Sequence, residues 1–199
     1  MPPSRRQFFR RAVGLCALGA ASVLAVVRVS GYHVDPARAR SLRALSPWQL
    51  VVVDAVLLRM CGADVPYDAP GAPPSPAEVG AAEFVDAFIA ESPPHIRSDL
   101  LQLIALVEHG YPLSCGYRRR FTALDHNSQD DVLARLERSS VDLLRGCFSA
   151  LKSLMMMAYY RDPRTWGIID YDGPLVNRPD KGWTPPRFVA LGTKGATPP

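Results

Sequence analysis

The stretch "SQDDVLARLERSSVDLLRGCFSALKSLMMMAYY", residues 128–160, carries the clearest periodic pattern in the chain and decides the fold class. Apolar or small residues recur at positions 133, 136, 140, 143, 147, 151, 154 and 158. Steps of three and four residues are typical of an α-helix that packs one face on a core. The stretch is longer than about 25 residues, so we predict a kinked helix, with the kink at Ser139–Ser140 or at Gly146.

Helix start signals occur earlier in the chain. The motif "SPWQ" at 46–49 is a capping box with proline in the first helical position, and it predicts a helix that ends at Gly62. The related motif "SPAE" opens a predicted helix over residues 75–92. A third predicted helix covers residues 94–109 and ends at Gly110.

No run of the sequence alternates with a period of two, so we predict no sheet. The fold class is therefore all-α, an irregular bundle of four to six helices over residues 42–162. Residues 163–199 are rich in proline and glycine but keep large apolar side chains, which a disordered tail usually lacks. We predict an extended arm that lies against the protein's own helices or against another subunit.

The N-terminal segment combines arginines with an apolar run. Ser4, Arg5, Arg6, Phe8 and Phe9 resemble a twin-arginine (Tat) export signal. The uncharged run over residues 12–27 would span about 24 Å as a helix, less than the roughly 30 Å hydrocarbon core of a bilayer. No clean small-residue cleavage site follows it. Residues 1–31 are therefore predicted to be a Tat signal peptide or a retained N-terminal anchor helix.

The formal charge of +4 arises in this segment. Residues 1–31 hold five arginines and no acidic residue, which leaves 18 of the 23 basic residues to balance all 19 acidic ones. The body is thus close to neutral, which argues against a nucleic-acid partner.

A search for reactive groups finds no catalytic, cofactor or metal site. The spacing of His95, His109 and Cys115 matches no known ligand pattern, although the three could converge in space. Three consecutive methionines at 155–157 point 100° apart on a helix and cannot share a ligand face. The acidic residues Asp54, Glu83, Asp86 and Glu108 are interpreted as solvent-facing charges on helices.

The body contains three cysteines, Cys61, Cys115 and Cys147. They could form one disulfide with a spare thiol, or a bond to a partner subunit, and the sequence leaves both open.

The stretch "SALKSLMMMAYYRDPRTWGIIDYDGPLV", residues 149–176, resembles the gluconate 2-dehydrogenase subunit 3 family. The resemblance covers most of residues 42–176, and Asp170 stands where we expect glycine. Its hallmarks are an aromatic pair, an Asp-Pro turn, a tryptophan and a Tyr-x-Gly-Pro segment: Tyr159, Tyr160, Asp162, Pro163, Trp166, Tyr171, Gly173 and Pro174.

The resemblance implies a noncatalytic small subunit of a membrane-associated sugar or polyol dehydrogenase. The FAD would belong to a large GMC-type flavoprotein subunit, and haem to a multihaem cytochrome c subunit. The small subunit would carry the folded flavoprotein through the Tat translocase to the periplasmic face of the membrane. The hallmark residues would either contact that partner or fill the protein's own core. Two alternatives are a membrane-anchored helical assembly or structural protein without a dehydrogenase partner, and a stand-alone enzyme or metal protein.

Overall fold

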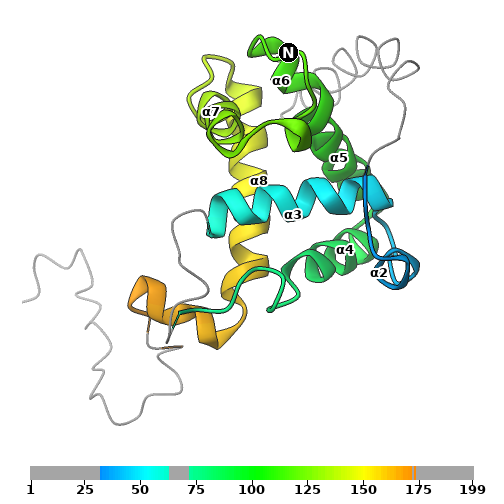
Figure 1. Ribbon diagram of the computed structural model, residues 1–199, viewed down its shortest axis with the longest axis vertical. Coiled ribbons are helices and arrows are strands. Elements are labelled where there is room, and N and C mark those ends of the chain that lie inside the picture. Colours follow the sequence, from blue (N-terminus) through cyan, green and yellow to red (C-terminus); the bar gives the residue numbers. More distant parts are fainter. Residues whose placement is uncertain (1–31, 63–71, 172, 174–199) are drawn as a thin grey trace, which may run out of the picture.

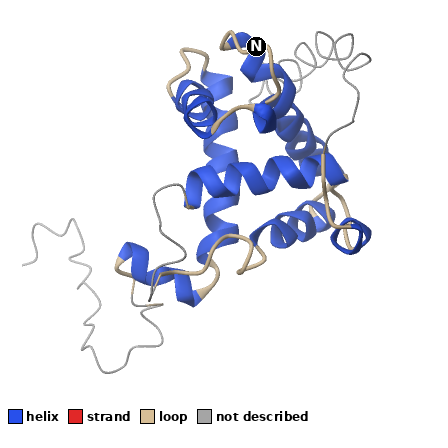
Figure 2. Cartoon of the chain, viewed as in Figure 1, coloured by secondary structure: helices blue, strands red, loops and turns tan. Residues whose placement is uncertain are grey.

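The computed structural model describes residues 32–62, 72–171 and 173, and every regular element in them is helical (Figure 2). The absence of strands from these residues confirms the all-α class, while the predicted signal over residues 1–31 lies outside them. Two of the α-helices have five residues or fewer. The α-helices are α2 (Pro36–Arg40), α3 (Pro47–Cys61), α4 (Ala81–Glu91), α5 (Pro94–Ala105), α6 (Tyr111–Ser114), α7 (His126–Glu137) and α8 (Asp142–Tyr160). A π-helix, η1 (Leu106–Gly110), and two 3-10 helices, η2 (Phe121–Ala123) and η3 (Pro163–Ile169), complete the described elements.

Helix α8 forms the axis of the bundle. Helix α3 crosses it, α7 lies at one end of it and η3 lies at the other end (Figure 1). Helix α3 also contacts α4, α5 and α7, so it joins both halves of the molecule. Within the described residues, no helix combines the length and the apolar character needed to cross a bilayer.

The capping box at the start of α3 is present as predicted. The Gln49 side-chain oxygen accepts hydrogen bonds from both the backbone N–H and the hydroxyl of Ser46, each at 2.8 Å. The helix ends before Gly62, whose N–H donates to the Leu58 carbonyl. Its buried side chains, including Val53 and Leu57, join the same core as the buried face of α8.

The prediction of one kinked helix over residues 128–160 is wrong, because the chain forms two separate helices there. The break falls at one of the two predicted kink positions: the Ser139 hydroxyl accepts the N–H of Val141, and Val141 is extended (φ −88°, ψ 114°). A serine side chain that bonds nearby backbone competes with the helical ladder in this way. Gly146 lies inside α8, and Ser140, a predicted core position, is exposed. Beyond the break the predicted stripe is buried, at positions 147, 151, 154 and 158.

The predicted helix over residues 75–92 is also interrupted. Both capping-box bonds form: Glu78 accepts the N–H of Ser75 at 2.6 Å, and the Ser75 hydroxyl accepts the N–H of Glu78 at 3.3 Å. They close only one turn, because Gly80 adopts a left-handed conformation (φ 63°). Two backbone bonds of a Schellman motif (3.0 and 3.1 Å) end this turn before α4 begins at Ala81.

The third predicted helix does not end at Gly110. The chain continues from α5 through the π-helical turn of η1 into α6. The same turn corrects the interpretation of Glu108 as solvent-facing, because its side chain is fully buried.

Asp86 on α4 is the second acidic residue whose predicted exposure is wrong. Its carboxylate is buried and accepts the backbone N–H groups of Arg43, Ala44 and Leu45 at 2.7–2.9 Å. It therefore anchors the segment that leads into α3. The remaining two, Asp54 and Glu83, lie nearer the surface, and both pair with Arg38.

Candidate functional site

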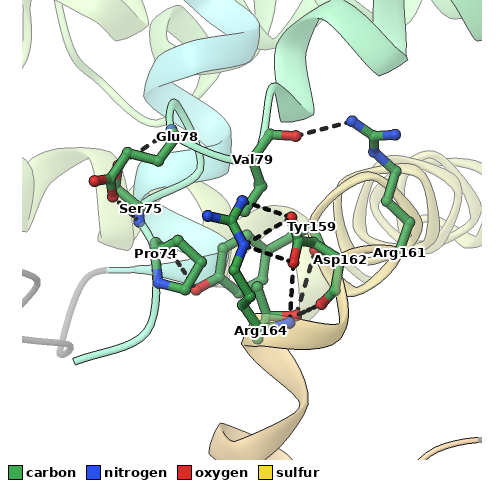
Figure 3. A network of polar contacts seen from close by, with 9 residues as sticks. Pro74, Ser75, Glu78, Val79, Tyr159, Arg161, Asp162 and Arg164 are labelled. Atoms are coloured by element: carbon green, nitrogen blue, oxygen red, sulfur yellow. Dashed lines mark hydrogen bonds and ion pairs between the residues drawn. The ribbon is translucent and has the colours of Figure 1, made fainter. Parts of the chain in front are cut away.

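Two of the residues that carry the family resemblance, Tyr159 and Asp162, lie where α8 ends and η3 begins (Figure 3). Asp162 caps η3: its carboxylate accepts the backbone N–H of Arg164 at 2.9 Å and pairs with the Arg164 guanidinium at 2.7 Å. These bonds to Arg164 lower the pKa of Asp162 to about 2. Pro163 occupies the first helical position, where no N–H donor is required.

Tyr159 fills the protein's own core at this corner. Its ring is fully buried, and its hydroxyl donates to the Pro74 carbonyl at 2.9 Å (Figure 3). The neighbouring Arg161 donates to the Val79 carbonyl at 2.8 Å, and its guanidinium lies 5.1 Å from the centre of the Phe84 ring. The end of α8 is thereby joined to the turn that precedes α4.

A second aromatic group continues from the core to the surface. The Trp166 indole N–H donates to the Tyr160 carbonyl at 2.8 Å, and the rings of Tyr159 and Tyr160 meet edge to face at 5.1 Å. Trp166 also meets Tyr171 edge to face at 5.1 Å. A side chain at Gly173 would place its Cβ 2.9 Å from the Trp166 ring, so this close approach requires glycine.

Asp170 adopts a left-handed backbone conformation (φ 49°) at the end of η3. It is the one non-glycine residue with positive φ in the described part of the chain. The conformation explains why the family pattern leads us to expect glycine at this position, since glycine adopts it without a Cβ penalty.

The structure thus brings together seven of the eight hallmark residues, while Pro174 and the export-signal residues Ser4, Arg5, Arg6, Phe8 and Phe9 lie outside the described residues. The start of the predicted extended arm is helical instead, because Pro163–Ile169 forms η3.

The corner exposes an apolar surface that we call the η3 apolar face, made of Ile168, Ile169 and Tyr171. Their side chains are 40%, 50% and 44% exposed. Single exposed apolar residues are common, but three of them lie here within four positions of the chain, close to a half-buried tryptophan. The two isoleucines were not predicted as site residues. The signal that could have indicated them is that they follow the family's tryptophan closely in the chain.

A second polar cluster, which the sequence did not indicate, surrounds the π-helical turn of η1. We call Tyr32, Glu108, Arg120 and Thr122 the Glu108 clasp. One Glu108 oxygen accepts the hydroxyls of Tyr32 and Thr122, both at 2.6 Å, and the other accepts the Thr122 N–H at 3.1 Å. The Arg120 guanidinium lies 3.7 Å from the carboxylate and 4.0 Å from the centre of the Tyr32 ring.

Burial shifts the pKa values of groups in and beside the clasp. Burial and the Glu108 carboxylate together raise the pKa of Tyr32, so its hydroxyl remains a donor. The adjacent His109 ring packs 5.4 Å from the Trp48 ring, and burial lowers the pKa of His109. His109 therefore packs against an aromatic ring, whereas the sequence had suggested that it lies at the end of a helix.

The other candidate groups lie apart. No cluster of three or more His, Cys, Asp or Glu side chains that could hold a metal ion occurs among the described residues. Cys61, Cys115 and Cys147 form no disulfide with one another. Burial raises the pKa of Cys61 to about 12 and also raises that of Cys115, which keeps both thiols protonated at neutral pH.

Comparison with known proteins agrees with the hallmarks at the corner. Searches of curated proteins and of solved structures each found no match. The family described as "Gluconate 2-dehydrogenase subunit 3" matches residues 51–173, from the first turns of α3 to Gly173 beside Trp166. The match covers more than half of the chain and contains both the bundle and the η3 corner. The chain therefore belongs to the gluconate 2-dehydrogenase subunit 3 family.

Proposed function

We propose that this chain is the noncatalytic small subunit of a periplasmic, membrane-associated, FAD-dependent dehydrogenase that acts on CH–OH groups of sugars or polyols. The observation that carries the proposal is the family match over residues 51–173, which ends at the η3 corner. A family defined as one subunit of a dehydrogenase implies a larger catalytic partner. FAD would be bound by that partner, a GMC-type flavoprotein, and haem by a multihaem cytochrome c subunit.

The η3 apolar face is the proposed contact with the flavoprotein. Tyr159, Tyr160 and Trp166 anchor η3 to the bundle, so the exposed Ile168, Ile169 and Tyr171 are held on a fixed scaffold. A pre-ordered apolar patch costs little entropy on binding, which favours a stable interface. Full burial of one such side chain contributes about 1.5–3 kcal/mol.

The proposed second role is export of the flavoprotein in its folded form. Ser4, Arg5, Arg6, Phe8 and Phe9 would supply the Tat signal for both subunits, because a flavin loaded in the cytoplasm requires its protein to cross the membrane folded. The small subunit would then hold the complex at the periplasmic face of the membrane.

Affinity purification of the tagged full chain from the membrane fraction of its native host tests the partnership. We expect a large subunit with the absorbance spectrum of bound FAD to purify with it. Replacement of Arg5 and Arg6 by lysine should leave the complex intact but retain both subunits in the cytoplasm. Recovery of the chain alone, as expected of a structural protein without a dehydrogenase partner, would contradict the proposal.

A further inference from the structure

The Glu108 clasp fixes the position of Tyr32, the residue that follows the predicted N-terminal signal or anchor. Tyr32, the first described residue, bonds to Glu108, which lies 76 positions later in the chain, and its ring lies under Arg120. Glu108 lies in η1, the turn that joins α5 to α6, and α6 lies at the end of the bundle away from η3 (Figure 1). The clasp therefore gives the N-terminal segment a defined point of attachment.

The apolar run starts a short distance from this point. Four residues, 28–31, separate Tyr32 from the end of the uncharged run over residues 12–27. A fully extended chain rises by at most about 3.6 Å per residue. Wherever the apolar run enters a bilayer, Tyr32 can thus lie no more than about 18 Å from it.

The loop that leads into the clasp is basic. Backbone bonds from Gly116 to the Leu113 carbonyl and from Tyr117 to the Pro112 carbonyl, each at 3.0 Å, turn the chain sharply after α6. The turn leads directly into Arg118, Arg119 and Arg120, of which the last belongs to the clasp. We call residues 113–119 the basic loop.

The two arginines of the basic loop are available for an external anion. Arg118 and Arg119 are both exposed, and neither forms an ion pair with a carboxylate in the described part of the chain. Residues 111–124 contain no acidic residue, although the body as a whole is close to neutral. Leu113, in the same loop, is 52% exposed and adds an apolar side chain to it.

We propose that the basic loop lies on the membrane surface, with Arg118 and Arg119 on the phosphates of anionic phospholipids and Leu113 at the headgroup boundary. This proposal rests on the proposed function, with residues 1–31 retained as the N-terminal anchor, one of the two alternatives that the sequence leaves open. The short tether holds the loop near the headgroups, where a weak electrostatic contact becomes effective. It leaves the η3 apolar face, at the other end of α8, free for the flavoprotein.

Vesicle flotation of the full chain tests the contact. Partition is measured on phosphatidylcholine vesicles and on vesicles that also contain 30% phosphatidylglycerol. A basic side chain close to an anionic surface contributes about a fivefold gain in partition. With two such side chains removed, the gain in partition on adding phosphatidylglycerol should therefore fall by roughly 25-fold in the variant R118Q/R119Q.

Two further variants make the result specific to the loop. The matched control R145Q/K152Q removes the same charge from exposed positions on α8 and should keep most of the gain. R118K/R119K retains the charges and should behave like the wild type, which separates loss of charge from misfolding. The basic N-terminal arginines are present in every variant, so they cancel in the comparison.

An unchanged gain in vesicle partition in R118Q/R119Q would overturn the proposal. An equal loss of that gain in R145Q/K152Q would also overturn it, because it would show an effect of overall charge. The same preparations are assayed for retention of the flavoprotein. Loss of lipid dependence in R118Q/R119Q with the flavoprotein retained supports the lipid contact. If no flavoprotein is retained with the wild type, that result contradicts the proposed function but not the lipid contact.

Discussion

Glu108 shows how one residue can hold distant segments of this chain together. Its carboxylate is fully buried, yet the hydroxyls of Tyr32 and Thr122 and the guanidinium of Arg120 surround it. Burial of a charge is tolerated only when such partners replace water. The π-helical turn of η1 places the residue inward, and one-turn π-helices are frequent at functional positions.

Substitution of Glu108 by alanine should destabilise the fold strongly. The variant breaks a buried ion pair and removes the acceptor of the Tyr32 and Thr122 hydroxyls, so we expect a loss of about 3–5 kcal/mol in the free energy of unfolding. Tyr32→Phe removes one hydrogen bond to a charged group and should cost about 1.5–3 kcal/mol. Urea unfolding of the two single variants and the double variant gives their coupling energy.

Glu83→Gln is the matched control for Glu108. Glu83 is half exposed and its ion pair with Arg38 lies at the surface, so the loss should stay below about 1 kcal/mol. Equal losses at Glu83 and Glu108 would show that the clasp adds nothing to stability beyond an ordinary surface ion pair.

Helical elements were predicted well where the signal is local. The capping box at residues 46–49 and the stripe at 147, 151, 154 and 158 both depend on neighbours within one or two turns, and both are confirmed. The η3 corner was also indicated, because its hallmark residues follow one another along the chain.

The failures have two origins, local backbone breaks and contacts with distant segments. "SPWQ" and "SPAE" have the same start signal, but Gly80 ends the second after one turn. The break at Ser139 comes from a side-chain bond to the backbone of Val141, which the spacing of apolar residues does not report. The π-turn at Glu108 places its carboxylate against Tyr32, 76 positions away in the chain. For the same reason no local pattern could have revealed that Glu108 and Asp86 are buried.

The left-handed Gly80 makes a prediction about the turn before α4. Gly80→Ala should lower the free energy of unfolding by about 1–2 kcal/mol, because an L-residue is strained at φ 63°. The nearest heavy atom to the added Cβ is 3.7 Å away, so strain rather than a clash is responsible. Gly146→Ala, inside α8 with open space around it, should instead stabilise by up to about 1 kcal/mol. Thermal unfolding measures both, and two effects of the same sign would refute this explanation.

The capping of η3 by Asp162 makes the corner sensitive to acid. The folded-state pKa of Asp162 is lowered to about 2 from an ordinary value near 3.8 by Arg164. A depressed carboxyl pKa contributes stability that is complete above the unfolded pKa and is lost as pH falls through the folded value. We therefore expect the environment of Trp166 to change between about pH 4 and pH 2. Tryptophan fluorescence measures this transition. Asp162→Asn removes the titrating carboxylate, so the part of the fluorescence change that arises from its protonation should disappear.

The whole molecule separates its two proposed attachments along α8. The basic loop follows α6 at one end, η1 with Glu108 leads into α6, and η3 lies at the opposite end (Figure 1). An N-terminal segment held at one end does not compete for surface with a flavoprotein bound at the other. A small subunit that carries and anchors a larger enzyme requires such a division.

Charged substitutions at the η3 apolar face should weaken the complex without unfolding the subunit. Ile168→Asp and Ile169→Asp place a carboxylate in the proposed interface, and each should raise the dissociation constant for the flavoprotein by at least about 30-fold, or 2 kcal/mol.

The control for these variants is Val141→Asp, which introduces the same charge at a 51% exposed position at the other end of α8. It should leave the dissociation constant unchanged. Titration of the purified flavoprotein by calorimetry measures all three variants. Export of the flavoprotein should fall with affinity in the two isoleucine variants, because a signal on one subunit serves the other only while they remain bound. Normal affinity in Ile168→Asp and Ile169→Asp would move the interface away from η3.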